Sequence, residues 1–488
     1  MPDILNIGIT GLHTSKKSLE TTSHNIANVN TEGYSKQRVH QSTNSPISKG
    51  GLVQGSGVRI NKIARDHDKF VEKRLNSNIS SEQFFRHRTE QLEQVENIFN
   101  EIDQDGLNKV LNKFFNSFRE LSNNPENETI RSVVRDNASL VVKDFHRIKE
   151  TLDGLVDGIN GKIKGEVSEI NEITRRVAHL NKKIATLEVV KNETGDLRDQ
   201  RDELIRELSK SFKIHTYQDE KGRYVVSAVN VGTLVTGTNT AELAAGPVSA
   251  DSSKSGMPGA MEVYFKNRPS GPITNKFKSG RVSSLINVRN QDIKDLYDKV
   301  DLIAHELVQT VNAVHRRGYV NRKVELDANG NPPLSDSKGP TTGLDFFKSI
   351  ESGVKGAAAM IDLSDDVKND LSNISTALAP NAPGDNRVAV AISKIQHERI
   401  LGGGVATLEE SYLSSIGNLG LQTRKANLDH EQAEGLKALT ENIKQRVSGV
   451  SLDEEAANMV RFQQVYEANA KVMQTADEMM KTIMSIKR

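Results

Sequence analysis

Apolar residues recur every seven positions near both ends of this 488-residue chain. Near the C-terminus the first row contains Leu452, Met459, Tyr466, Met473 and Met480. A second row, one position earlier, contains Val465, Val472, Met479 and Ile486. A sustained seven-residue repeat keeps one side of a helix facing a partner helix, as in coiled coils. We therefore expect residues 451–486 to form a helix that packs against another helix.

The N-terminal segment carries a matching repeat of Leu5, Leu12, Leu19 and Ile26. Gly8, Ser15 and Thr22 form a row of small residues beside it, which would let another helix come close. We infer that the two terminal segments pack together. The alternative is that each stripe covers a local helical core, which is the commoner arrangement for a single amphipathic helix. Matching repeats at both ends favour the shared bundle.

The predicted partner interface combines large apolar residues of both terminal segments. It consists of Leu5, Leu12, Leu19, Ile26, Leu452, Met459, Phe462, Val465, Tyr466, Val472, Met473, Met480 and Ile483. Ser451 and Glu454 have the spacing of a capping box, and the acidic residues at 453–455 suit the positive end of a helix dipole. The pattern therefore places the start of the C-terminal helix at this point.

The chain contains 65 basic and 64 acidic residues, so its formal net charge is +1. This balance gives no electrostatic reason to expect a nucleic acid or an anionic membrane as a partner. Cysteine is absent, which excludes disulfides and thiolate chemistry. The N-terminus lacks a basic region followed by an apolar run, so we expect no cleaved secretory signal. No apolar run is long enough to span a membrane.

Proline placement divides the chain, because proline breaks helix interiors. Nine of the twelve prolines lie between Pro247 and Pro383. We therefore predict a mainly α fold with β insertions: an elongated coiled-coil or helical-bundle rod built from both ends, and a smaller β-rich domain from the middle. The predicted divisions are a terminal coiled-coil domain (1–35 and 450–488), a helical rod (36–212, 281–316 and 384–449) and a β-rich outer domain (213–280 and 317–383).

Helical periodicity is clearest between Ile159 and Leu187, where apolar residues are three or four positions apart. Glycines at 154, 158, 161 and 165 should loosen the start of this helix. Other helices are expected to begin near Asp66, at Pro125 and after Thr407, which forms a capping box with Glu410. The charged segment 196–205 is interpreted as a helix whose charged residues form a solvated face with side-chain pairs. A β-hairpin is expected at 214–231 and a strand at 261–266.

Motifs for catalysis or metal binding are not evident. No two histidines lie within four residues of each other, and there is no HExxH, G-x-S-x-G or phosphate-binding loop motif. We therefore predict no cofactor, no metal site and no enzymatic activity.

Residues 23–39, SHNIANVNTEGYSKQRV, resemble the N-terminal signature of the flagellar axial proteins, which include rod, hook and hook-associated members. Its signature positions here are Asn25, Ala27, Asn28, Asn30, Thr31, Gly33 and Tyr34. Residues 451–480 resemble the C-terminal signature of the same family. The segments 197–209 and 343–347 are most similar to hook-associated members, whereas Lys36 stands where arginine is common and the central β region matches no known pattern.

The resemblance implies an extracellular structural protein of the bacterial flagellum, exported without cleavage through the flagellar type III channel. It implies a ring of copies that joins the hook protein to hook-associated protein 3, and an export chaperone that holds the C-terminal helix beforehand. Two alternatives stay open: a hook- or rod-class subunit, and a secreted coiled-coil effector. The long helical seam at 159–187 is unusual for the former, and matched repeats at both ends are not needed by the latter.

A rough energy comparison predicts how the terminal segments behave in a single copy. Burying the four large residues of the N-terminal row would gain about 6–12 kcal/mol. Ordering some thirty residues costs at least about 1 kcal/mol each. We therefore expect both ends to be disordered in the monomer and to become helical on assembly.

Overall fold

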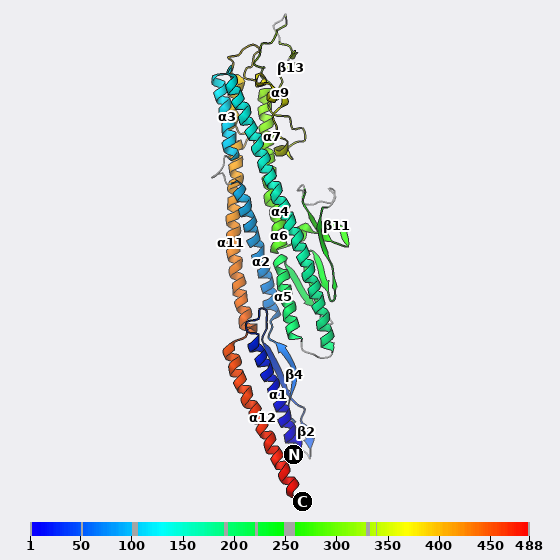
Figure 1. Ribbon diagram of the computed structural model, residues 1–488. Coiled ribbons are helices and arrows are strands. Elements are labelled where there is room, and N and C mark those ends of the chain that lie inside the picture. The colour runs from blue at the N-terminus through cyan, green and yellow to red at the C-terminus, as the bar shows by residue number, and fades with distance from the viewer. Residues whose placement is uncertain are drawn as a thin grey trace.

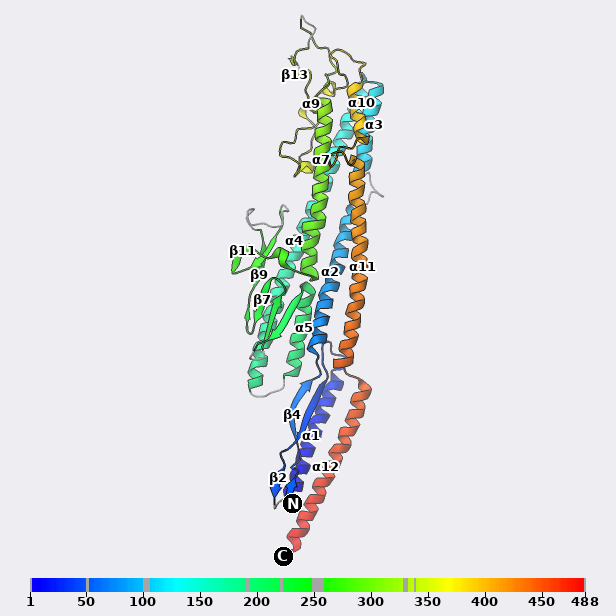
Figure 2. The ribbon, with the colours of Figure 1, turned by 180° about the vertical axis from the view of Figure 1, so that it is seen from behind.

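The computed structural model describes residues 2–49, 52–99, 106–189, 194–219, 223–247, 259–327, 332–337 and 339–486. The molecule is elongated, and its long helices run roughly along the long axis (Figure 1). Both ends of the chain lie at the same tip, and residues from the middle of the chain form the side and the opposite tip (Figures 1 and 2). The prediction of an elongated, mainly helical fold with β insertions is confirmed.

The terminal unit consists of two long helices and two β-hairpins. Helix α1 (Pro2–Ala27) lies antiparallel beside helix α12 (Leu452–Ile486). Strand β1 (Gln37–Thr43) pairs antiparallel with β4 (Val58–Arg65), and β2 (Ile47–Lys49) pairs with β3 (Leu52–Gln54) beyond them.

Strands β1 and β4 also pack on α1. The division drawn from the sequence assigned residues 36–65 to the rod, but the structure places them in the terminal unit. Gly57 helps explain this position, because its φ is +95° and an added Cβ would lie 2.3 Å from Thr10 Oγ1 of α1. The polar pattern of the hairpin gave no indication of this contact.

The rod domain is a bundle of helices that lies above the terminal unit in Figure 1. Its helices are α2 (Lys69–Phe99), α3 (Leu107–Asn123), α4 (Glu128–Val189), α5 (Gly195–Ser211), α6 (Gly280–Asn287), α7 (Lys294–His315), α10 (Arg387–Lys394) and α11 (Leu408–Ser448). Helix α2 packs along α11, α3 packs on α4 and α10, and α5 packs on α2 and α4. A π-helical segment, Val288–Ile293, joins α6 to α7.

Helix α4 is continuous over 62 residues. The four glycines near its middle do not interrupt it, and an added Cβ at any of them would meet no atom within 4 Å. Predicted seam residues from Ile159 to Ile184 are buried, because the rest of the rod packs against this face. The helix is thus held by burial along its length, which outweighs the weak helix propensity of glycine.

Three helix starts can be compared with the sequence. Thr407 and Glu410 form the predicted capping box at α11. Helix α2 is capped by Asp68 rather than Asp66, since the Asp68 carboxylate accepts from Phe70 N at 2.7 Å. Helix α4 begins at Glu128 and not at Pro125, because the Asn127 side chain accepts from Thr129 N. Asp and Asn side chains near a helix start compete for this role, so a single candidate is easily misplaced by two residues.

Two small sheets lie against one side of α4 (Figure 2). The first has the order β5-β6-β7-β8, from β5 (Ile214–Gln218), β6 (Tyr224–Ala228), β7 (Gly232–Thr236) and β8 (Asn239–Thr240). The second has the order β11-β10-β9, from β9 (Leu243–Gly246), β10 (Glu262–Phe265) and β11 (Arg268–Pro272). All neighbouring strands are antiparallel. The expected hairpin and the strand at 261–266 are therefore present.

The described residues of the segment 317–383 contain few strands, contrary to the prediction of a β-rich region. Their described regular elements are β12 (Ser335–Asp336), β13 (Gly339–Pro340), α8 (Ala357–Met360), α9 (Asp365–Asn369) and the 3-10 turn at Leu371–Asn373. Phe346 and Phe347 are fully buried and their N–H groups donate to the Asn312 side chain of α7. Buried aromatic side chains and side-chain hydrogen bonds therefore hold this segment in place. Such contacts do not require the alternation of apolar and polar residues that is typical of strands.

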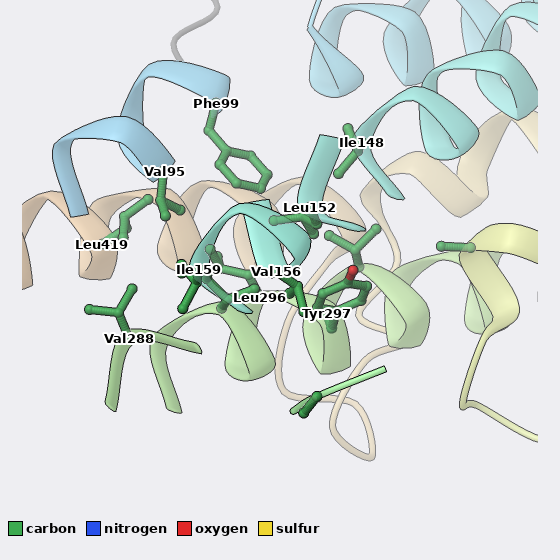
Figure 3. Close-up of a cluster of buried hydrophobic side chains, with 14 of the residues drawn as sticks. Val95, Phe99, Ile148, Leu152, Val156, Ile159, Val288, Leu296, Tyr297 and Leu419 are labelled. Carbon is green, nitrogen blue, oxygen red and sulfur yellow. The ribbon is translucent and has the colours of Figure 1, made fainter. Parts of the chain in front are cut away.

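The apolar core runs through the rod domain and includes the sheets. Its middle contains residues from α2, α4, α7 and α11, such as Val95, Leu152, Leu296 and Leu419 (Figure 3). No described residue of the terminal unit belongs to this core. Within the terminal unit as described, Ala476 is the only buried apolar side chain.

Candidate assembly site: the terminal helices and their joint to the rod

Small residues of α1 allow α12 to approach it closely. An added Cβ on Gly8 would lie 2.8 Å from Met473 Cγ, and one on Gly11 would lie 2.5 Å from Asn469 Oδ1. Ser15 and Thr22 are buried. Asn469 Nδ2 also donates to Ser15 Oγ at 3.4 Å. Close backbone approach through small residues is thus the basis of this helix pair.

The predicted interface residues occupy less buried positions. On α1 the residues Leu5, Leu12, Leu19 and Ile26 are half-buried, as are Met459, Phe462 and Met473 on α12. The residues Leu452, Val465, Tyr466, Val472, Met480 and Ile483 are exposed, with 39–52% of each accessible to solvent. The structure brings the two helices together but leaves six of the nine predicted interface residues of α12 exposed.

Both terminal segments are helical and packed in the single chain, which differs from the expectation of disordered ends. The energy comparison counted only the four large residues of the N-terminal row. It omitted the β-hairpins that pack on α1 and the polar contacts that join the terminal unit to the rod.

Asn25 is the centre of a buried polar cluster at the rod end of α1, with 1% of its surface exposed. Its Nδ2 donates to Gln37 O and to Glu455 Oε2, both at 3.0 Å. Its Oδ1 accepts from Tyr34 Oη at 2.7 Å and from Gln37 N at 3.0 Å. One amide therefore connects α1, the following loop, β1 and α12. A buried amide with all of these partners satisfied fixes one arrangement of the segments around it.

The other signature residues form the end of α1 and the loop that follows it. Gly33 has a φ of +82°, and an added Cβ there would lie 2.8 Å from Glu203 Oε2 of α5. Asn28 Nδ2 donates to His24 O, and Thr31 Oγ1 donates to Asn28 Oδ1. Ala27 and Asn30 are exposed.

Burial raises the pKa of Tyr34, and the nearby carboxylates of Asp196, Asp199 and Glu455 raise it further. The hydroxyl of Tyr34 therefore stays protonated and can donate to Asn25.

The first turn of α12 is tied to β1 by charge. Lys36 Nζ contacts Glu454 Oε2 at 3.1 Å, and Arg38 Nη2 contacts Glu454 Oε1 at 3.2 Å. A hydrogen bond and positive charge from Lys36, with a smaller contribution from Arg38, hold the pKa of Glu454 below its ordinary value. The predicted capping box is therefore incomplete: Ser451 Oγ accepts from Glu454 N at 3.5 Å, but the Glu454 carboxylate is paired with these two cations.

Helix α5 supplies a second set of ties, which the sequence interpretation missed. Arg65 of β4 contacts Asp199 Oδ1 at 2.6 Å and Asp202 Oδ2 at 2.5 Å. Ser35 donates to Asp199 through its backbone N at 3.0 Å and its hydroxyl at 2.8 Å. The prediction that the charged residues form a solvated face is wrong for Asp199, Arg201 and Asp202, which are all buried.

A sequence signal for this burial exists. Arg201 precedes Ile205 and Leu208 by four and seven positions, which places it on the apolar face of the helix. In the structure, the Arg201 guanidinium lies 3.7 Å from the ring centre of Tyr224 and donates to Asn181 Oδ1. The spacing of Arg201 from the apolar residues indicates that its side chain points into the protein. It does not identify the residues that Arg201 contacts there.

A groove of about 880 Å³ lies beside the joint, lined by the signature loop, α4 and α5. It carries acidic and basic side chains, including Glu32, Arg175, Arg176 and Glu203.

In the part of the chain that the structure describes, no group of three or more His, Asp or Glu residues is arranged to hold a metal ion. Over the same residues, no helix has the length and apolarity that a membrane span requires.

Comparisons with known proteins give consistent results along the chain. Residues 92–333 match the model of the flagellar hook-associated protein FlgK helical domain. Residues 5–34 match the flagella basal body rod protein family, and 445–486 match the flagellar basal body rod FlgEFG protein C-terminal family. The match at 92–333 disfavours the alternative of a rod- or hook-class subunit, and all three matches disfavour an unrelated effector.

Relatives named flagellar hook-associated protein 1 match over nearly full length. The Bacillus subtilis (strain 168) protein is 29% identical, with 97% of this chain and 96% of that protein covered. The Escherichia coli (strain K12) protein is 24% identical, with full coverage of both chains. The solved structure of the flagellar hook junction protein FlgK from Burkholderia pseudomallei has the same fold, with a TM-score of 0.62 and 14% identity over 78% of this chain and 100% of that chain. The chain is thus similar over nearly its full length to proteins named flagellar hook-associated protein 1, and this similarity supports a structural role in the bacterial flagellum.

Proposed function

We propose that this chain is a structural subunit of the junction between the flagellar hook and filament, and that copies assemble into a ring through α1 and α12. The observation that carries this proposal is the uncovered apolar surface of α12. Its exposed apolar residues are Leu452, Val460, Val465, Tyr466, Val472, Met479, Met480, Ile483 and Met484. They lie in a unit that has almost no apolar core of its own.

Neighbouring subunits can gain binding free energy by burying this apolar surface. Residues that are already half accessible would each gain on the order of 1 kcal/mol when a neighbour covers them. Nine such residues can offset a large part of the entropy lost on association. Extended apolar surface on an otherwise polar protein marks an interaction site.

The neighbours in this proposal are further copies of the chain, the hook protein on one side and hook-associated protein 3 on the other. The chain reaches the cell exterior by flagellar type III export without a cleaved signal, and an export chaperone covers α12 on the way. Its role is assembly and not catalysis, in keeping with the structural relatives.

Deletion of residues 451–488 tests the assembly role. The melting temperature of the rod domain should change little, because no described residue of α12 belongs to the apolar core. Junction assembly, scored by filament growth and by electron microscopy of hooks, should be lost. A large fall in the melting temperature of the rod would contradict the expectation that the rod is stable without α12.

A point variant separates surface from fold. Val472→Asp combined with Ile483→Asp places charge on the exposed apolar face and should abolish assembly, whereas Gln474→Asp adds charge at an exposed polar position of the same helix and should not. Normal filament growth in the double variant would exclude this face as the assembly surface.

The chaperone proposal has its own test. Met473→Asp combined with Met480→Asp should weaken binding of the export chaperone to the C-terminal helix, measured by calorimetry with the full chain. Gln474→Asp again serves as the control. Unchanged affinity in the double variant would place the chaperone site elsewhere.

A further inference from the structure

The joint between the terminal unit and the rod is polar, and α5 provides its rod side. Asp196, Asp199 and Glu203 are spaced three and four positions apart and lie on one face of this helix. Each faces the terminal unit: Gln37 Nε2 donates to Asp196 Oδ1 at 2.8 Å, Ser35 contacts Asp199, and Gly33 lies against Glu203. No described residue of the terminal unit contributes to the apolar core. Hydrophobic packing therefore does not set the angle between the two parts.

Within this polar joint, Arg65 makes a buried contact with two carboxylates. The side chains of Arg65, Asp199 and Asp202 are 9%, 7% and 7% exposed. Burial alone would lower the pKa of Arg65, but Asp202 and Asp199 raise it above its ordinary value, so the guanidinium stays charged. A two-pronged contact between one guanidinium and two fixed carboxylates restricts both position and direction.

Ser35 strengthens the restriction from a second segment. Its backbone N–H and hydroxyl both donate to Asp199, and Ser35 itself is buried. Arg65 is the last residue of β4, and Ser35 lies two residues before β1 begins. The two carboxylates of α5 thus hold both chain segments that connect the hairpin to its neighbours.

We propose that Asp199 and Asp202 are positioning residues, which fix the direction in which α1 and α12 leave the rod by holding Arg65 and Ser35. Because a buried ion pair tolerates little rotation, the terminal helices point in one direction before any neighbour binds. The consequence for ring assembly rests on the proposed function, whereas the effect on the joint itself does not.

Distance measurements between spin labels test the proposal in the isolated full-length chain. The chain has no cysteine, so two introduced cysteines are the only labelling sites. Gln422→Cys on α11 and Lys471→Cys on α12 are both exposed and report across the joint. Gln422→Cys and Glu150→Cys, also exposed, report within the rod. Each pair is measured by pulsed electron paramagnetic resonance.

Asp199→Asn combined with Asp202→Asn should widen the distance distribution across the joint about twofold, because Arg65 loses both charged partners. The distribution within the rod should stay as narrow as in the parent chain. Asp298→Asn, which removes an exposed carboxylate paired with Lys294 on α7, is the control and should change neither distribution. An unchanged distribution across the joint in the folded double variant would overturn the proposal.

A second variant covers the case in which the double variant also disturbs the rod. Ser35→Ala combined with Arg65→Lys leaves α5 intact but removes the serine hydroxyl and the two-pronged guanidinium. It should also widen the distribution across the joint alone, and a narrow distribution in this variant would overturn the proposal. Filament growth is scored separately: a widened joint with normal junction assembly would refute the consequence for ring assembly, while leaving the positioning role and the proposed function intact.

Discussion

The terminal unit and the rod domain are both built from long helices, but they are stabilised differently. The rod has a continuous apolar core that extends from α3 and the buried phenylalanines to the sheets on α4. The terminal unit has one buried apolar side chain among its described residues and depends on small-residue helix contact and polar ties. The difference indicates that the rod is a complete folding unit, whereas the terminal unit is half of an interface.

The same comparison explains why large apolar residues have opposite roles in the two parts. In the rod, Phe114, Phe118 and Phe346 pack with ring centres 5.3–5.8 Å apart. In α12, Val465 and Val472 remain exposed although they belong to a regular heptad. Heptad spacing predicts that one face of a helix will be buried. It does not indicate whether the same chain or another chain buries that face.

The largest expected effect comes from cutting into the rod core. Phe346→Ala should lower the free energy of unfolding by about 3–5 kcal/mol, because it opens a cavity among buried aromatic rings. Val472→Ala, in the terminal unit, should change it by less than about 0.5 kcal/mol. Urea unfolding followed by circular dichroism measures both. Similar losses for the two variants would remove the distinction between core and interface.

A second prediction uses the pH dependence of the rod. His315 is completely buried, its Nδ1 lies 2.7 Å from Leu344 O, and its Nε2 accepts from Ser375 N at 2.9 Å. Burial lowers its pKa to about 4. Between about pH 6.5 and 4 the unfolded chain therefore binds a proton that the folded chain does not, so stability falls as the pH falls.

The expected loss from His315 is about 2–3 kcal/mol between pH 7 and pH 4.5. His315→Gln should remove this part of the pH dependence, and urea unfolding at both pH values measures the difference between the two proteins. Because the terminal unit contains no comparable buried histidine among its described residues, the effect should be confined to the rod. If the free energy of unfolding depended equally on pH in the variant and the parent, His315 would not be the source of this pH dependence.

The smallest expected effect concerns the seam between α1 and α12. Gly8→Val should cost about 1–3 kcal/mol locally, since its branched side chain would overlap Met473 and approach the α12 backbone. Faster amide hydrogen exchange in α12, with unchanged exchange in the rod, is the measurement. Gly158→Ala, at an open position of α4, is the matched control and should stabilise the rod by about 0.5–1 kcal/mol. Unchanged exchange in α12 would mean that close approach at Gly8 does not hold the pair.

The sequence by itself determined the elements whose signals are local and periodic. Heptads predicted the terminal helices and their pairing, apolar residues three and four positions apart predicted the buried face of α4, and Thr407 with Glu410 predicted the start of α11. Periodicity is a property of one segment, and a helix buries the same face whichever partner covers it. These predictions therefore required no knowledge of the partner.

Only the tertiary structure decided which surfaces are buried and by what. It placed the polar hairpin β1–β4 on α1, buried Asp199, Arg201 and Asp202 of α5, and left many large apolar side chains of α12 exposed. A charged side chain such as Asp199 has the same local sequence signal whether it faces water or Arg65. The difference depends on a residue 134 positions away along the chain, and contacts of that kind exist only once the whole chain has folded.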